Sequence, residues 1–333
     1  MSLFTRDYNY ELPASLIADR PAPCREDARM MVLHRANSRI EHRRFSEFPN
    51  FLSDGDLVVL NDTKVVPARV FSDTGKIEML FLEQAGVNLW KCMVRPGRKM
   101  RVGDAVGVGG SVGRVTEILP DGERLVQFSA PVDFEKFGNI PLPPYIRREA
   151  DHDDVERYQT VFAQSPGAIA APTAGLHFTP EILEGIPHAF LSLHVGVGTF
   201  KPVQAGHLGG HRMHSERFVI GKGAAEKINA AQRIVAVGTT TVRLLEACAR
   251  EGDVATGARP AIRASEGATD IFIHPPFQFR ITGAMLTNFH IPCSTLLMLV
   301  SAFAGREFIL HAYAEAVREQ YRFYSYGDCM LIL

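Results

Sequence analysis

Two segments of the sequence combine histidine with small residues that let a ligand approach the backbone closely. In the first, alanine, proline and glycine precede His177, and Thr179 before a proline is typical of a helix start. The second contains His207, His211 and His214. Imidazole exchanges protons near neutral pH, so either segment could supply a general base. For His177 the alternative is a histidine that is simply hydrogen-bonded in the fold.

The histidines of the second segment do not form a recognisable metal site. Gly209 and Gly210 interrupt any helical spacing, and no cysteine or carboxylate pattern completes a ligand set. The five cysteines are odd in number and include no CxxC pair. We therefore predict no bound metal. A metal-dependent hydrolase remains an alternative that metal analysis of the purified protein would test.

Two segments rich in glycine or threonine are candidates for ligand binding. Gly196 and Gly198 follow an apolar strand pattern, but the third glycine and the helix of a dinucleotide-binding fingerprint are missing. A nucleoside-contacting loop and a bulged strand both remain open there. Residues 237–243 predict a strand, a turn and a helix start, where backbone amides favour a carboxylate or phosphate. A plain helix cap would need only one of the three threonines in that segment.

Polar residues at three further places need either partners or ligands. Asn288 and His290 stand immediately before a buried apolar segment, where a bound substrate could satisfy their hydrogen bonds. Lys64 and Arg69 follow asparagine, aspartate and threonine, which suits an RNA phosphate or a solvated turn. Tyr326 lies in an aromatic stretch that could stack on a base or form a packed terminal strand.

The elements that must position these residues indicate two units. The chain has 333 residues, 46% of them hydrophobic, which is enough for two compact units or one domain with an insertion. Between residues 55 and 130, short β-rich runs alternate with turns, and the remainder alternates strands with helical patterns. We predict an α/β main domain, residues 1–54 and 150–333, with an inserted small antiparallel β-barrel domain at residues 55–149.

Charge and hydropathy exclude several classes of protein. The formal net charge is −1, so any RNA-binding surface must be a local patch. The first ten residues lack the apolar core of a signal peptide. The longest apolar stretch, residues 291–304, is shorter than the roughly 20 residues that a membrane helix needs. We expect a cytoplasmic protein that does not associate with membranes.

Seven segments of the chain, in order, resemble the S-adenosylmethionine:tRNA ribosyltransferase-isomerase family. The likeness extends from residue 10 to residue 331 and so covers nearly the whole chain. The segments are LNDTKVVPAR, AAPTAGLHFT, HVGVGTFKPV, MHSE, VGTTTVR, TNFHIPCSTLLMLVSAFAG and YRFYSYGD.

The resemblance implies both the interrupted α/β fold and a reaction. S-adenosylmethionine is then a co-substrate, and no cofactor is permanently bound. Its ribosyl group is transferred and isomerised onto 7-aminomethyl-7-deazaguanine in the tRNA anticodon, which gives epoxyqueuosine, adenine and methionine. The sulfonium acidifies the adjacent ribose methylene, so a histidine base could remove a proton there and start the loss of adenine. We expect the enzyme to be a monomer.

The matched segments also supply candidate residues for each function. The candidate bases are His177, His194 and His214, followed by His290. The candidates for binding the methionine carboxylate are Thr239, Thr240, Thr241 and Arg243. The remaining candidates for binding S-adenosylmethionine are Thr173, Gly175, Gly196, Gly198, Thr199 and Asn288. The candidates for binding RNA are Lys64, Arg69, Arg95, Arg98 and Lys99, in a basic patch on the β unit, and Tyr326.

One loop departs from the pattern that the resemblance implies. Pro275, Pro276 and Phe277 stand where a Pro-Gly-Tyr sequence is expected, so a flexible glycine and a phenol are missing there. A noncatalytic RNA-binding protein is the second alternative to the enzyme. It predicts RNA binding that does not depend on S-adenosylmethionine, and it leaves the buried polar segments unexplained.

Overall fold

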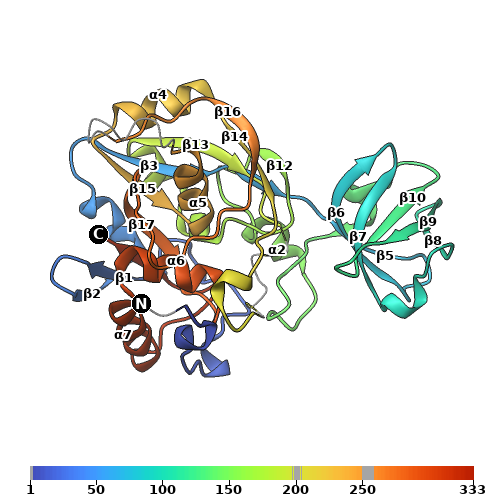
Figure 1. Ribbon diagram of the computed structural model, residues 1–333, viewed down its shortest axis with the longest axis horizontal. Coiled ribbons are helices and arrows are strands. Elements are labelled where there is room, and N and C mark those ends of the chain that lie inside the picture. Colours follow the sequence, from blue (N-terminus) through green and yellow to red (C-terminus); the bar gives the residue numbers. More distant parts are fainter. Residues whose placement is uncertain (1–2, 197, 199–202, 204, 250–258) are drawn as a thin grey trace.

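A nine-stranded mixed sheet forms the larger unit of the protein (Figure 1). The computed structural model describes residues 3–196, 198, 203, 205–249 and 259–333. The strand order is β16-β14-β13-β3-β15-β17-β18-β1-β2, with β13, β3, β15 and β17 mutually parallel. The strands are β1 (Arg29–His34), β2 (Arg39–Arg44), β3 (Asp56–Asn61), β13 (His188–Leu193), β14 (Glu216–Ile220), β15 (Arg233–Val237), β16 (Ser265–Thr269), β17 (Thr282–Asn288) and β18 (Cys329–Ile332).

Apolar side chains cover both faces of this sheet. Alternate residues of a strand point to opposite faces, so Val59 belongs to one core and Val58 to the other. The first core includes the longer helices, and the second includes Phe45, Phe48 and Phe178. The α-helices are α1 (Phe134–Phe137), α2 (His152–Arg157), α3 (Pro180–Glu184), α4 (Lys222–Ala230), α5 (Thr239–Cys248), α6 (Thr295–Ala304) and α7 (Arg306–Arg318).

A seven-stranded antiparallel sheet lies apart from the larger unit (Figure 1). Its order is β11-β5-β6-β7-β10-β9-β8, and side chains such as Val70, Phe81 and Phe128 form its own core. The strands are β5 (Arg69–Phe71), β6 (Glu78–Gly86), β7 (Leu89–Arg95), β8 (Ala105–Val108), β9 (Ser111–Ile118), β10 (Arg124–Phe128) and β11 (Gly138–Asn139).

Short elements connect the two sheets and line the larger one. A two-stranded parallel pair, β4 (Thr63–Val65) with β12 (Ser165–Ala168), lies where the chain leaves β3. The 3-10 helices are η1 (Thr5–Tyr8), η2 (Ala14–Leu16), η3 (Phe45–Phe51), η4 (Gly97–Lys99), η5 (Thr173–His177) and η7 (Leu208–Gly210).

One predicted boundary differs from the observed sheets. Residues 56–61, which the sequence placed in the insertion, form β3 in the middle of the nine-stranded sheet. A central parallel strand and a barrel strand can both appear in sequence as a short apolar run after an Asp-Gly turn. Hydrophobic periodicity therefore did not distinguish the two. The seven-stranded sheet begins only at Arg69 and ends at Asn139.

The first fifty residues contribute two strands to the larger unit. β1 pairs in parallel with β18, and β2 pairs with β1. Within the described residues, no single helix is long and apolar enough to cross a membrane. α6 and α7 pass that test only as a pair that is bent by 115°.

Candidate active site

The seven matched segments meet at one edge of the nine-stranded sheet. β3, β13, β15 and β17 are parallel, so their carboxyl ends lie at the same edge, where open α/β sheets bind ligands. β14 is antiparallel to β13 and β18 is antiparallel to β17, which brings Glu216 and the residues before Cys329 to this edge as well. The segment after Ala170 joins them because the Ala170 amide donates to Val195 O, at 3.3 Å.

A small cavity lies between these loops. It encloses about 60 Å³, which is room for about two water molecules. S-adenosylmethionine is much larger, so it would extend through the open mouth or displace part of the wall. Five predicted residues line this cavity, which we call the edge cavity: Thr173, Thr239, Thr240, Asn288 and His290.

The amino end of α5 forms one wall of the edge cavity. Gly238 precedes the helix with φ +87°, a backbone conformation that residues other than glycine rarely adopt. Thr239 and Thr240 face the cavity. Thr241 does not, because its Oγ1 donates to Val237 O at 2.7 Å inside the core. Two of the three predicted threonines are therefore available to a ligand.

Arg243 does not line the edge cavity. It is buried one turn further along α5, where its Nη1 donates to Glu216 Oε2 at 2.5 Å and its Nε to Ile271 O at 3.2 Å. Glu216 Oε1 accepts a hydrogen bond from the Gly196 amide at 3.0 Å. Arg243 and Glu216 thus hold three matched segments together. Arg243 Nη2 is buried with no hydrogen-bond partner among the described residues, and direct binding of a substrate carboxylate by Arg243 stays a prediction.

His290 is the predicted base that lines the edge cavity. Its Nε2 lies 3.1 Å from Thr287 Oγ1, and its backbone is fixed by Tyr313 and Tyr10. Burial lowers the pKa of His290 to about 3. The imidazole is therefore neutral at physiological pH.

His177 lies behind Asn288 and does not reach the edge cavity. Asn288 Nδ2 donates to the carbonyls of Tyr324 and Ser325, at 2.9 and 3.2 Å. Its Oδ1 therefore accepts from His177 Nε2, 2.9 Å away, and this network assigns the proton of the neutral ring to Nε2. Burial lowers the pKa of His177 to about 4. The structure indicates that His177 orients Asn288.

The two other candidate histidines lie outside the edge cavity wall. His194 is half-buried beside Thr63, with 2.8 Å between Nδ1 and Oγ1, and its pKa is lowered chiefly by burial. His214 is exposed and lies against Gly198, where an added Cβ would stand 2.3 Å from the imidazole Cδ2.

The predicted glycines contribute to packing. A Cβ at Gly175 would stand 2.8 Å from the Phe162 ring, so this glycine permits a close contact with the core and does not face the edge cavity. Gly196 is held by Glu216. The prediction for Thr199 lies outside the described residues.

Tyr145 is a cavity residue that the sequence reading missed. It lines the edge cavity, its hydroxyl bonds to Ser325 Oγ, and its ring lies 4.7 Å from that of Tyr324. The proline-rich passage before it suggested only a connection between units. A tyrosine directly after Pro143 and Pro144 was the available signal.

The predicted RNA-binding residues fall into three groups. Lys64, Arg95, Arg98 and Lys99 are exposed. Arg69 is partly buried, with its Nε 3.2 Å from Glu78 Oε1. The prediction for Tyr326 is wrong: it is buried, and its hydroxyl donates to Asp154 Oδ1 at 2.6 Å, so its ring is not available to stack on a base. Tyr326 is packed, as the alternative expected, but it lies in a turn before β18 and not in a strand.

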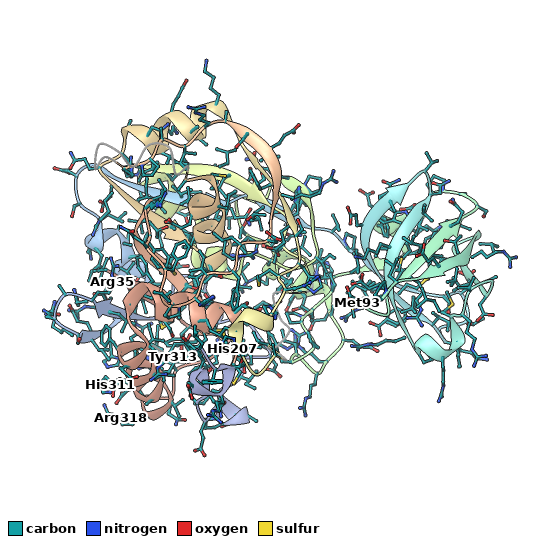
Figure 2. The ribbon with its side chains drawn as sticks, in the orientation of Figure 1. Arg35, Met93, His207, His311, Tyr313 and Arg318 are labelled. Atoms are coloured by element: carbon teal, nitrogen blue, oxygen red, sulfur yellow. The ribbon has the colours of Figure 1, made fainter. Side chains whose placement is uncertain are left out.

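No set of three or more histidine, cysteine or acidic side chains is arranged to hold a metal ion in the part of the chain that the structure describes. The Pro275–Phe277 loop lies away from the edge cavity. It lines a broad groove with His207, Arg306 and His311, and Figure 2 labels His207 and His311.

Known proteins resemble this chain over almost its full length. The family model described as queuosine biosynthesis protein matches residues 5–332. A protein of Thermotoga petrophila named S-adenosylmethionine:tRNA ribosyltransferase-isomerase is 47% identical over 98% of this chain and 99% of its own. A protein of the same name from Moorella thermoacetica is 48% identical, with the same coverage.

A solved structure also matches. The crystal structure of S-adenosylmethionine tRNA ribosyltransferase from Thermotoga maritima has 38% sequence identity and a TM-score of 0.56, and the match covers 98% of this chain and 100% of that one.

Proposed function

This chain belongs to the queuosine biosynthesis protein family, and from that premise we propose that it is an S-adenosylmethionine:tRNA ribosyltransferase-isomerase. It transfers and isomerises the ribosyl group of S-adenosylmethionine onto 7-aminomethyl-7-deazaguanine at the tRNA wobble position. The products are epoxyqueuosine, adenine and methionine. The observation that carries this proposal is the meeting of all seven matched segments at one sheet edge, where five of them line the edge cavity.

The chemistry needs a neutral base beside a positively charged sulfur. The sulfonium acidifies the ribose carbon next to it, and removal of that proton starts ring opening with loss of adenine. The substrate amine then bonds to the sugar, and closure of the epoxide breaks the carbon–sulfur bond, which releases methionine as a neutral thioether.

His290 is our candidate for the base. Geometry comes first in such an assignment, and His290 is the one of the four candidate histidines that lines the edge cavity. A pKa of about 3 keeps its imidazole unprotonated but makes it a weak base. The proton that it removes must therefore be strongly acidified, as a proton beside a sulfonium is.

The amino end of α5 is our candidate site for the methionine carboxylate. Backbone amides and the helix dipole favour an anion there, and the Thr239 and Thr240 hydroxyls face the same space. Arg243 acts one step away, through Glu216 and Gly196.

We further propose that the seven-stranded sheet is an inserted β-barrel domain that holds the RNA. Lys64, Arg95, Arg98 and Lys99 are exposed at or near this sheet and can contact phosphates, which gives binding that weakens as salt rises. We also propose that the enzyme is a monomer, and that the reaction takes place in the cytoplasm because its substrate is a tRNA.

The test is to incubate the protein with S-adenosylmethionine and tRNA that carries 7-aminomethyl-7-deazaguanine. We expect free adenine together with a modified wobble nucleoside, and neither product when one substrate is omitted. RNA binding without adenine release would favour the noncatalytic alternative. Activity that disappears with a chelator and returns with a metal ion would favour the hydrolase.

A further inference from the structure

A second cavity lies between the two sheets. One side is formed by residues of the seven-stranded sheet, including Glu78, Leu80 and Met93, and the other by residues 141–144 with Ile169. It encloses about 220 Å³. A cavity of roughly 150 Å³ is enough to hold benzene, so a two-ring base fits here. We call it the inter-sheet cavity; Figure 2 labels Met93 where the seven-stranded sheet approaches the larger unit.

The inter-sheet cavity adjoins the edge cavity along two chain segments. In one segment, Ile169 and Ala170 line the inter-sheet cavity, and the next residues, Ala171 to Ala174, line the edge cavity. Pro144 lines the inter-sheet cavity, and Tyr145 lines the edge cavity. A molecule in one cavity is therefore separated from the other by little more than the thickness of these segments.

The inter-sheet cavity combines apolar walls with one carboxylate, that of Glu78, and two arginines, Arg69 and Arg95. Leucine, methionine, proline and isoleucine side chains suit the faces of an aromatic ring. Glu78 Oε1 lies 3.2 Å from Arg69 Nε, and Arg69 Nη2 donates to Leu142 O at 3.0 Å. The bond to Leu142 fixes Arg69 beside Glu78, and the Glu78 carboxylate retains free lone pairs beside this ion pair.

We propose that the inter-sheet cavity binds the flipped-out target base and that Glu78 accepts hydrogen bonds from it. This rests on the proposed function. A guanine-type base presents two neighbouring donors, N1–H and the exocyclic amine, which match two carboxylate oxygens, whereas adenine presents only one donor group on that edge. The 7-substituent lies on the opposite edge of the base, so it points away from Glu78 and toward the edge cavity. An anticodon base is unpaired, so extruding it costs little.

The first test is Glu78→Gln, with adenine release measured against the concentration of each substrate. The glutamine amide replaces one carboxylate oxygen, an acceptor, with an NH2 donor, which would then face a donor group of the base. We expect kcat/KM for tRNA to fall by about tenfold or more, and KM for S-adenosylmethionine to change by less than about twofold. Glu83→Gln is the matched control, because Glu83 is exposed on the same strand and does not line the cavity.

A second variant tests the same cavity without touching the Arg69 ion pair. Met93→Trp fills the space with an indole and should weaken tRNA use selectively, with an unchanged thermal midpoint. In a direct binding measurement, free 7-aminomethyl-7-deazaguanine should bind the unaltered protein and bind at least about tenfold more weakly to both variants.

Two outcomes would overturn this assignment. A selective rise in KM for S-adenosylmethionine would show that the cavity takes the donor's adenine, and unchanged constants for both substrates in both variants would show that it takes neither. Failure of the proposed function looks different, because the unaltered protein would then release no adenine at all.

Discussion

The two sheets hold their polar side chains in opposite ways. At the edge of the nine-stranded sheet, Arg243, Glu216, Asn288 and His177 are buried and bonded to one another or to the backbone. On and beside the seven-stranded sheet, Lys64, Arg98 and Lys99 are exposed. Buried polar networks are costly to break and fix a geometry, whereas exposed cations act almost independently. This difference supports the proposed division of roles, in which the nine-stranded sheet carries the chemistry and the seven-stranded sheet attracts RNA through independent cations.

The largest effect should come from the edge cavity itself. Replacing His290 with alanine removes the proposed base, and we expect adenine release to slow by about 10²- to 10⁴-fold. His311→Ala is the control, since His311 is exposed on α7. Near-normal turnover in the His290 variant would remove this histidine from the mechanism.

The next largest effect should come from breaking the buried ion pair between Arg243 and Glu216, and it should appear as a loss of stability. Arg243→Ala leaves Glu216 buried without this cation, and we expect the free energy of unfolding to fall by about 3–5 kcal/mol. Denaturant unfolding measures this loss. Arg212→Ala, which changes an exposed arginine four residues before Glu216, should have little effect.

A double variant sharpens that prediction. Removing both Arg243 and Glu216 should cost clearly less than the sum of the two single losses, because no unpaired charge is then left inside. Strictly additive losses would mean that the two side chains do not interact energetically.

Acid should weaken the larger unit through its neutral histidines. The pKa values of His177 and His290 are about 4 and 3 in the folded protein, below the ordinary histidine value of 6.5. The unfolded chain therefore takes up protons first. The contribution of these two histidines is complete above pH 6.5 and is lost as pH falls toward 4, by about 1.4 kcal/mol per pH unit for each histidine.

Denaturant unfolding at pH 7 and pH 5 checks this slope. In a His290→Asn variant the part of the slope that comes from His290 should disappear. An identical pH dependence in the variant and the unaltered protein would contradict the burial of a neutral imidazole at this position.

The smallest effects belong to the seven-stranded sheet. Arg98→Ala with Lys99→Ala should weaken binding of an anticodon stem-loop and reduce the dependence of log affinity on log salt by about one for each lost phosphate contact. Stability should change by less than about 0.5 kcal/mol. Arg318→Ala, on α7, is the control cation. An unchanged salt dependence would place the RNA elsewhere.

The sequence predicted local elements better than it predicted side-chain partners. The strand before Gly238 and the helix after it follow from an apolar run, a glycine and a threonine-rich start, and the structure confirms them as β15 and α5. β3 was misplaced because a run of apolar residues does not reveal which sheet it joins.

Side-chain partners across long sequence separations could not be predicted. Arg243 looked like a ligand-binding cation because nothing in its own segment shows that Glu216 faces it. Tyr326 looked available to RNA because Asp154, which holds its hydroxyl, lies 172 positions away. Such pairs depend on the sheet order, and local pattern does not contain that information.

The pairing of β1 with β18 determines when the nine-stranded sheet can be completed during synthesis. Residues 29–44 join the nine-stranded sheet only through residues 329–332, so the ribosome must make almost 300 intervening residues before the first hairpin can dock. Such distant pairing folds slowly and leaves strand edges uncovered meanwhile. The seven-stranded sheet pairs only within residues 69–139 and can be complete long before that. During translation, the seven-stranded sheet, which we propose holds the RNA, should therefore fold before the edge cavity forms.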